Sequence, residues 1–192
     1  MTVTQMDALS MSESHHQRMH WLSEQVLNWS GLPVVHVRPT VLLENPLFGM
    51  LAVRSIRESG RLSLPFGSGR TSPVASSDVA DVVTAILTAP QDHLGAVYEL
   101  TGPATLDVDE LANQYAQALG RTITADRPPY DEWLRDLDRL GLPPHVEQHI
   151  ATMARLHSED RYNRSTQDVQ DITGHPAQTV RQYVEQHRDV FG

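Results

Sequence analysis

The sequence predicts an α/β fold: the C-terminal part of a doubly wound Rossmann-type parallel sheet, plus a mostly helical substrate subdomain. Three observations support this prediction. Residues 34–38 form a nearly continuous apolar run, which is typical of a parallel strand covered on both faces. Residues 96–101 form a second run of this kind. Helices and strands alternate up to residue 126, and the chain is predicted to be helical from Tyr130 onward.

The first predicted helix is capped by Ser12 or Ser14 and runs to about residue 29. Residues 1–11 show no helical periodicity. Spacings of three and four give the helix one apolar face, made of Met19, Leu22, Val26 and Trp29. Gly31 then ends the helix ahead of strand 34–38.

In the middle of the chain, proline and glycine mark where the predicted elements begin and end. Pro46 opens a helix that ends at Gly60, and residues 61–76 predict a short strand pair or an extended loop. A capping serine or Asp78 begins the next helix, which stops before Pro90. The remaining predicted elements are strand 96–101, a helix ending at Gly120, a strand at 121–126 on an edge or in a small separate sheet, and helices at 130–140, 144–157, 166–173 and 177–189.

This order predicts two interleaved parts. Residues 1–45 and 76–102 are expected to be a remnant of a Rossmann-like domain. Residues 46–75 and 103–192 are expected to form the substrate-side, mostly helical subdomain.

Composition excludes several classes of function. The net charge is −9 and no basic stripe is present, which argues against binding to nucleic acid or to an anionic membrane surface. The chain has no cysteine, and all 15 cationic residues are arginine, so thiolate, Schiff-base and P-loop lysine chemistry are excluded. No apolar stretch reaches the roughly 18 residues of a membrane span, and no secretory signal is recognisable. A cytoplasmic protein is therefore expected.

Four segments carry a resemblance to a known family. "SEQVLNWSGLPVVHVRPTVLLEN", "LPFGSGRTSPVASSDVADVVTAIL", "GAVYELTGPATLDVDELANQYAQALGRTI" and "DITGHPAQTVRQYVEQHRDVF" resemble, in this order, successive segments of the NmrA-like atypical short-chain dehydrogenases. The resemblance covers most of residues 12–191. It implies that the chain corresponds to the C-terminal portion of a protein whose Rossmann half binds NADP or NAD.

The resemblance also bears on catalysis. The superfamily's Tyr-x-x-x-Lys pair would fall near His16 and His20, so neither residue type is retained. No catalytic residue is therefore assigned, although a histidine could donate a proton near neutral pH. The chain has no G-x-G-x-x-G turn for a pyrophosphate, so these 192 residues alone are not expected to bind a dinucleotide tightly.

The predicted site residues lie near the end of strand 34–38. The resemblance implies cofactor contacts at His20, Pro39, Thr40 and Val41, and a substrate pocket that begins at Asn45 and Phe48. Two of these residues also have a structural explanation that is equally good. Thr40 would simply lie in the loop after a strand, and Asn45 would cap the helix that Pro46 opens. Arg38 is predicted to form a structural salt bridge, and Asp78 is predicted to cap a helix or to pair across subdomains.

The histidines suggest metal binding at first sight. His145 and His149 are four residues apart, but "HVEQH" supplies no third ligand at a suitable spacing, and the same holds for the histidines at 15, 16 and 20. No metal site is predicted, and these histidines are expected to be surface residues.

Three functions are compatible with these patterns. The first is the substrate-side part of an NAD(P)-dependent oxidoreductase that transfers hydride to a small quinone- or azo-like acceptor. The second is a non-catalytic NAD(P)-sensing regulator that binds a partner protein, which the loss of Tyr and Lys favours. The third is a fragment whose open sheet edge makes a homodimer.

Overall fold

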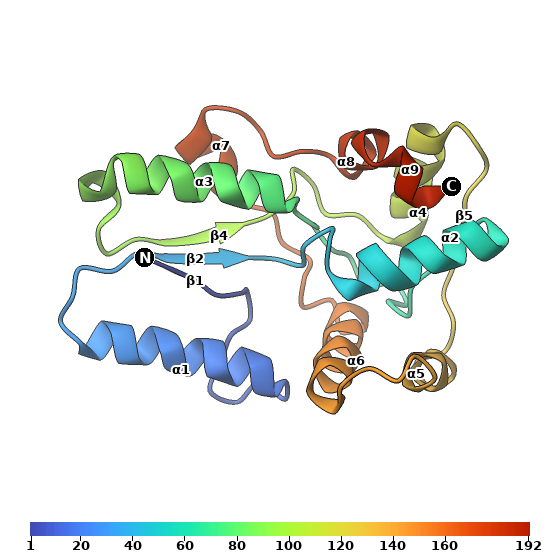
Figure 1. Ribbon diagram of the computed structural model, residues 1–192, viewed down its shortest axis with the longest axis horizontal. Helices are drawn as coiled ribbons and strands as arrows, with labels where there is room; N and C mark the ends of the chain where they lie inside the picture. The colour runs from blue at the N-terminus through green and yellow to red at the C-terminus, as the bar shows by residue number, and fades with distance from the viewer.

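The computed structural model describes residues 1–192. A parallel three-stranded sheet in the order β1-β2-β4 lies at one end of the molecule (Figure 1). Its strands are β1 (Thr2–Val3), β2 (His36–Pro39) and β4 (Val97–Leu100), and both pairings are parallel. The predicted parallel sheet around residues 34–38 is confirmed, and β1 forms an edge with no neighbour on its outer side.

Strand β1 is an element that the sequence did not indicate. The Thr2 and Thr4 amides donate to the carbonyls of Val35 and Val37, each at 2.9 Å. Only two residues are in the strand, and one of them is polar, so no apolar run marks it.

The helices begin and end close to the residues that the sequence predicts. They are α1 (His15–Trp29), the π-helix η1 (Leu47–Ala52), α2 (Val53–Ser59), α3 (Ser76–Thr88), the 3-10 helix η2 (Pro90–His93), α4 (Val108–Leu119), α5 (Tyr130–Asp138), α6 (Pro144–Ser158), α7 (Asp168–Thr173), α8 (Val180–Gln186) and α9 (Arg188–Phe191). None of them combines the length and the apolar composition that crossing a bilayer requires.

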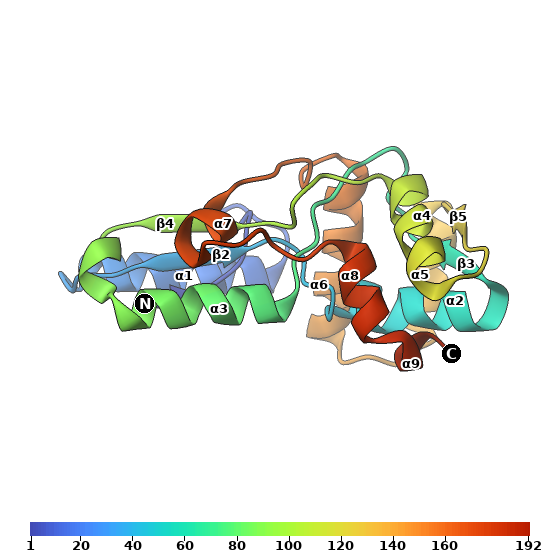
Figure 2. The ribbon, with the colours of Figure 1, turned by 90° about the horizontal axis from the view of Figure 1, so that it is seen from above.

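A second, smaller sheet lies in the helical end of the molecule. Strands β3 (Arg61–Ser63) and β5 (Thr124–Asp126) pair in parallel, which confirms the separate small sheet predicted for residues 121–126. The main core of 27 buried residues lies at this end, where α2, α4 and α5 surround the small sheet (Figure 2). A cluster of seven buried residues lies between the three-stranded sheet and helices α3 and α7.

Hydrogen bonds at the N-termini of α1 and α3 show why these two helices begin where they do. Ser14 is the N-cap of α1 and accepts the Gln17 amide at 3.3 Å, as predicted. Helix α3 differs from the prediction, because its N-cap is Ala75 and the Glu44 carboxylate accepts the Ser76 amide. Asp78 is buried, and its carboxylate accepts the Gln178 amide at 3.0 Å, so it ties α3 to the C-terminal segment.

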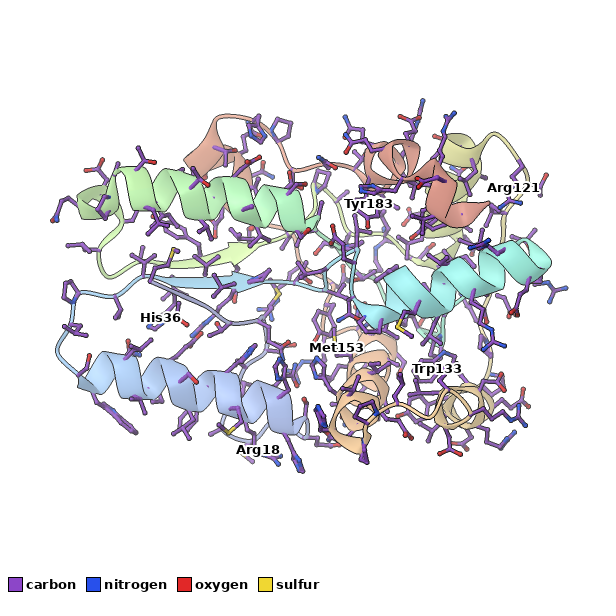
Figure 3. The ribbon with its side chains drawn as sticks, in the orientation of Figure 1. Arg18, His36, Arg121, Trp133, Met153 and Tyr183 are labelled. Atoms are coloured by element: carbon purple, nitrogen blue, oxygen red, sulfur yellow. The ribbon has the colours of Figure 1, made fainter.

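Helix α1 has its predicted apolar face, but that face points to solvent. Met19, Leu22, Val26 and Trp29 are all exposed, whereas the two buried residues of α1 are Gln17 and Glu24. The face that packs inward is polar because β2 presents His36 and Arg38 on this side, whereas Val37, and Val35 just before the strand, pack on the other side. His36 Nε2 donates to the Asn28 side chain at 2.8 Å. In Figure 3, His36 lies between the sheet and α1.

The strongest link between α1 and the sheet is an ion pair. Arg38 donates to both carboxylate oxygens of Glu24, at 3.0 and 2.5 Å, and Thr4 donates to the same carboxylate at 2.5 Å. The predicted structural salt bridge of Arg38 is confirmed. Burial alone would raise the pKa of Glu24, but these hydrogen bonds outweigh it and hold the pKa below its usual value.

Replacement of Glu24 with alanine should cost about 2 kcal/mol of unfolding free energy, because Arg38 then keeps a half-buried charge without its partner. Chemical denaturation at neutral pH measures this loss. The matched control is Glu58→Ala, which removes the exposed Arg54–Glu58 pair and should cost about 0.5 kcal/mol or less. Equal losses in the two variants would contradict the assignment.

Candidate functional site

The carboxyl ends of the three parallel strands meet at one edge of the sheet. The Met6 amide donates to the Pro39 carbonyl at 2.9 Å, and the Thr40 amide donates to the Leu100 carbonyl at 2.9 Å. The segments that follow β1, β2 and β4 therefore lie side by side, facing the first turns of α1 and helix α6 (Figure 1). Ligands of open parallel α/β sheets bind at this kind of edge.

Buried polar atoms without a protein partner gather at this edge. Six of the eight such atoms in the chain are Gln5 Nε2, Asp7 Oδ2, Gln17 Oε1, His20 Nδ1, Thr40 Oγ1 and Arg164 Nε. Native proteins leave few buried polar groups unsatisfied, because each costs roughly 1–3 kcal/mol. Their concentration at this edge makes it the candidate site for a polar ligand.

An ion-paired segment covers part of the edge. Arg164 Nη2 donates to the Asp7 carboxylate at 2.6 Å, and Arg164 Nη1 lies 3.3 Å from a carboxylate oxygen of Glu99. Asp7 follows β1 in a left-handed conformation with φ 57°, which aspartate tolerates better than most residues. The segment around residue 164 is thereby held across the ends of β1 and β4.

Three histidines meet beside this edge, where α1 contacts α6. The rings of His16 and His20 are 4.2 Å apart between centroids, and the ring of His149 lies 4.9 Å from that of His16. His149 Nδ1 is 2.8 Å from Ser14 Oγ. His16 and His20 are four residues apart on α1, so their rings share one face of the helix. His149 differs from the expected surface residue, because it packs between the two helices.

Burial controls the charge of this cluster. Burial first, and the neighbouring His16 second, lower the pKa of His20, and only Glu24 opposes them. Burial, with His16 and His20, lowers the pKa of His149 to about 4. Both rings are therefore mainly neutral near pH 7. No group of three or more His, Cys, Asp or Glu side chains has the arrangement to hold a metal ion.

The predicted cofactor residues differ in what they offer a ligand. The Pro39 carbonyl and the Thr40 amide are used within the sheet, and the Val41 carbonyl accepts the Val74 amide at 3.1 Å. The Thr40 hydroxyl is buried and has no partner. Thr40 and His20 thus retain free polar groups at the edge, whereas Pro39 and Val41 contribute backbone that is already bonded.

The two predicted substrate residues are placed differently. The Asn45 side chain accepts the Leu47 amide at 3.0 Å and lies 3.7 Å from Met153 Sδ. It therefore orders the start of η1, and it also contacts Met153 of α6. Phe48 is fully buried and packs edge-to-face on Phe66, so it belongs to the main core. Their roles in a substrate pocket stay predictions.

One cavity opens next to the strand ends. It has a volume of about 220 Å³, and its lining includes Asp7, Gln17, Arg155 and Arg161. A larger cavity of about 340 Å³ lies between α2 and α5, beside Trp133. The smaller one is the better candidate for a ligand, because it shares Asp7 and Gln17 with the set of unpartnered polar atoms.

Sequence reasoning missed most of the polar set at this edge. Gln5 and Asp7 were overlooked because β1 was not recognised, and nothing in a single sequence brings Arg164 beside Asp7. One signal was present in the sequence: polar residues come directly after each strand, Thr4 and Gln5 after β1 and Thr40 after β2.

No family model matches the chain, but a search of known proteins finds relatives. The chain is 28% identical over 174 residues to the NAD(P)H azoreductase of Xenophilus azovorans, which is 90% of this chain and 59% of that protein. It thus spans less than two thirds of the length of this relative.

Solved structures share the fold. The NADPH-dependent quinone oxidoreductase QOR2 of Escherichia coli in complex with NADPH superimposes with a TM-score of 0.82 at 21% identity, over 97% of this chain and 64% of that one. The negative transcriptional regulator NmrA in complex with NADP gives 0.71 at 16% identity, over 95% of this chain and 62% of that one. The chain is thus similar in sequence to an NAD(P)H azoreductase, and it shares the fold of QOR2 and NmrA.

Proposed function

We propose that the chain forms the nicotinamide- and substrate-side part of an NAD(P)H-dependent reductase that transfers hydride to a small quinone- or azo-like acceptor. The concentration of unpartnered buried polar atoms at the carboxyl edge of the parallel sheet carries this proposal. The names of the azoreductase and of the quinone oxidoreductase support the class of acceptor.

The residues at the edge suit the polar end of a nicotinamide. The Thr40 hydroxyl can donate or accept a hydrogen bond, the Gln5 amide nitrogen can donate, and the Gln17 oxygen can accept. Bound NAD(P)H would supply the hydride. His20 offers a neutral ring nitrogen at the position where the resemblance implies a lysine.

The residues of this chain suit only the nicotinamide end of the cofactor. No glycine-rich turn that could hold a pyrophosphate is present in the 192 residues. We therefore expect these residues to bind the dinucleotide weakly by themselves, and we infer that residues 1–45 and 76–102 act together with a phosphate-binding part.

The Thr40→Val variant tests the proposal in the longest reading frame that contains these residues. Loss of one buried hydrogen bond of roughly 1.4 kcal/mol should weaken NADPH binding about tenfold, measured by calorimetry. Thr84→Val, on the exposed side of α3, is the matched control and should leave the affinity unchanged. Undetectable NADPH binding by the unsubstituted protein would reject the proposal.

A second candidate is a dinucleotide-binding regulator without chemistry. The histidines at positions 16 and 20 in place of Tyr and Lys, together with the structural likeness to NmrA, favour it. Oxidation of NADPH with a panel of quinones and azo compounds separates the two candidates: binding without turnover identifies the regulator.

A further inference from the structure

The larger of the two cavities described above, of about 340 Å³, lies apart from the strand ends. Helix α5 and the residues directly after it form one wall, and η1 and α2 form the facing wall. Both helices lie at the end of the molecule opposite to the three-stranded sheet (Figure 1). None of the residues that line this cavity lines the cavity at the strand ends or carries an unpartnered buried atom. A ligand bound here is therefore separate from a ligand at the candidate site.

The buried side of this cavity is apolar. Trp133 is 5% exposed and Leu137 is fully buried, and both belong to the main core. Leu51 and Leu140 pack against that core and also line the cavity. The volume is at the lower end of the roughly 300–1,000 Å³ that is usual for small-molecule pockets, so the cavity fits a flat apolar body of one or two rings.

The indole of Trp133 is a free hydrogen-bond donor in this cavity. The two hydroxyl groups in the lining are already used. Ser55 Oγ donates to the Ala52 carbonyl at 3.0 Å, and Ser63 Oγ donates to the Asp126 carboxylate at 2.8 Å. Trp133 Nε1 donates to no acceptor of the chain, yet it is not among the eight buried unpartnered atoms. The indole N–H therefore stays open to solvent, and it can donate to a ligand.

Two ion pairs stand at the mouth of the cavity, one on each wall. Arg54 Nε donates to the Glu58 carboxylate at 2.9 Å, and Arg139 Nη1 donates to the Asp136 carboxylate at 2.6 Å. The four side chains are between 58 and 73% exposed, and pairs with this exposure contribute little to stability. Each arginine uses only one of its nitrogens, so both Nη atoms of Arg54, and Nε and Nη2 of Arg139, remain free to donate.

The free polar groups around the cavity are thus mostly donors. They are the indole N–H and the remaining N–H groups of two arginines on facing walls. Guanidinium groups bind carboxylates with paired, charge-assisted hydrogen bonds. A cationic ligand would meet both arginines, and an uncharged ligand would leave their free N–H groups to water. The cavity therefore suits a negatively charged aromatic molecule.

We propose that this cavity is an accessory binding site for a small aromatic carboxylate. The one or two rings of the ligand pack against Trp133 and Leu137, and its carboxylate is bound between Arg54 and Arg139. The ligand replaces the exposed carboxylates of Glu58 and Asp136 as a partner of the two arginines. This site does not depend on the proposed reductase function.

Calorimetric titration of the 192-residue protein with naphthoate tests the proposal. A dissociation constant below about 1 mM is expected for a ligand of this size. Arg54→Gln and Arg139→Gln should each weaken the binding of naphthoate at least about fivefold, because each removes one partner of the carboxylate. Both side chains are exposed, so unchanged thermal unfolding should show that the variants are folded.

Two further variants separate a binding role from a general effect of charge. Arg181→Gln is the matched control, because Arg181 donates to Glu185 at 2.8 Å in the same kind of pair on α8 and does not line the cavity. It should leave the affinity unchanged. Glu58→Gln should tighten binding about twofold or more, because it removes a carboxylate that competes for Arg54 and repels the ligand. Opposite effects at neighbouring positions are not expected from a structural role alone.

Two probes with the same rings test the chemical class of the ligand. Naphthalenemethanol is uncharged, and naphthylmethylamine is a cation at neutral pH. Both should bind at least about fivefold more weakly than naphthoate. Arg54→Gln should leave the affinity for naphthalenemethanol unchanged, because that probe offers no carboxylate to the arginine.

Four outcomes would overturn the proposal. They are the absence of naphthoate binding, equal or tighter binding of naphthylmethylamine, an equal loss of affinity in Arg181→Gln and Arg54→Gln, and full affinity in both Arg54→Gln and Arg139→Gln. The last result would place the bound naphthoate elsewhere on the protein.

Discussion

Replacing Gly69 with alanine is expected to destabilise the protein by about 3 kcal/mol or more. A Cβ atom at this position would lie 1.8 Å from the His157 carbonyl oxygen and 2.8 Å from its carbonyl carbon. Both are backbone atoms at the end of α6, so no flexible side chain can move aside. The loop before α3 and the whole of α6 would have to separate. Urea denaturation measures the effect.

The control for this variant is Gly67→Ala in the same turn. Gly67 has φ 56°, and a Cβ there would meet nothing within 4 Å. The alanine should therefore cost only about 1 kcal/mol, from backbone strain. Equal losses of unfolding free energy in the two variants would contradict the close contact between Gly69 and α6.

The stability of the fold is expected to fall by about 2 kcal/mol between pH 7 and pH 5 through His157 alone. This histidine is fully buried between the rings of Phe66 and Tyr162, at 4.1 and 4.2 Å between centroids. Its Nδ1 donates to the Met153 carbonyl at 2.7 Å, so Nε2 accepts from the Thr71 hydroxyl. The neutral ring is satisfied, and burial lowers its pKa to about 4.

The sign follows from proton linkage. Between the unfolded pKa of 6.5 and the folded pKa of about 4, the unfolded chain binds a proton that the folded chain does not. Stability is therefore full above pH 6.5 and is lost as the pH falls towards 4. His149, whose pKa is also lowered to about 4, adds to the loss in the same range.

The matched measurement compares the wild type with His157→Gln. Unfolding free energies at pH 7, 6 and 5 should fall steeply for the wild type and less steeply for the variant, whatever the absolute stability of the variant is. Parallel curves would show that His157 is not the group that titrates.

The local features of the fold were predictable from the sequence because they depend on neighbouring residues. Ser14 caps α1, and Gly60 and Gly120 end α2 and α4 in left-handed conformations, as their positions indicated. The parallel arrangement of β2 and β4 followed from their apolar runs. The two-residue strand β1 was missed because its pairing comes from the tertiary fold.

The candidate site was predictable only in part. The carboxyl end of strand 34–38 indicated Thr40, and the resemblance indicated His20, which lies beside His16 in the structure. The contact of His149 with these histidines depends on how α6 packs against α1, which no local pattern encodes. The apolar periodicity of α1 was also correct as a pattern, but periodicity cannot say whether a face meets its own core or lies on the surface.

The attachment of α1 through polar contacts has a consequence for how the molecule melts. Hydrogen bonds such as those of Glu24 with Arg38 and of His36 with Asn28 are directional, so they are lost together once the helix tilts, whereas none of the residues of α1 belongs to the 27-residue core. We expect the amide hydrogens of α1 to exchange with deuterium through a local opening, at a lower free energy than those of α4. The first helix would then be a separate foldon of the protein.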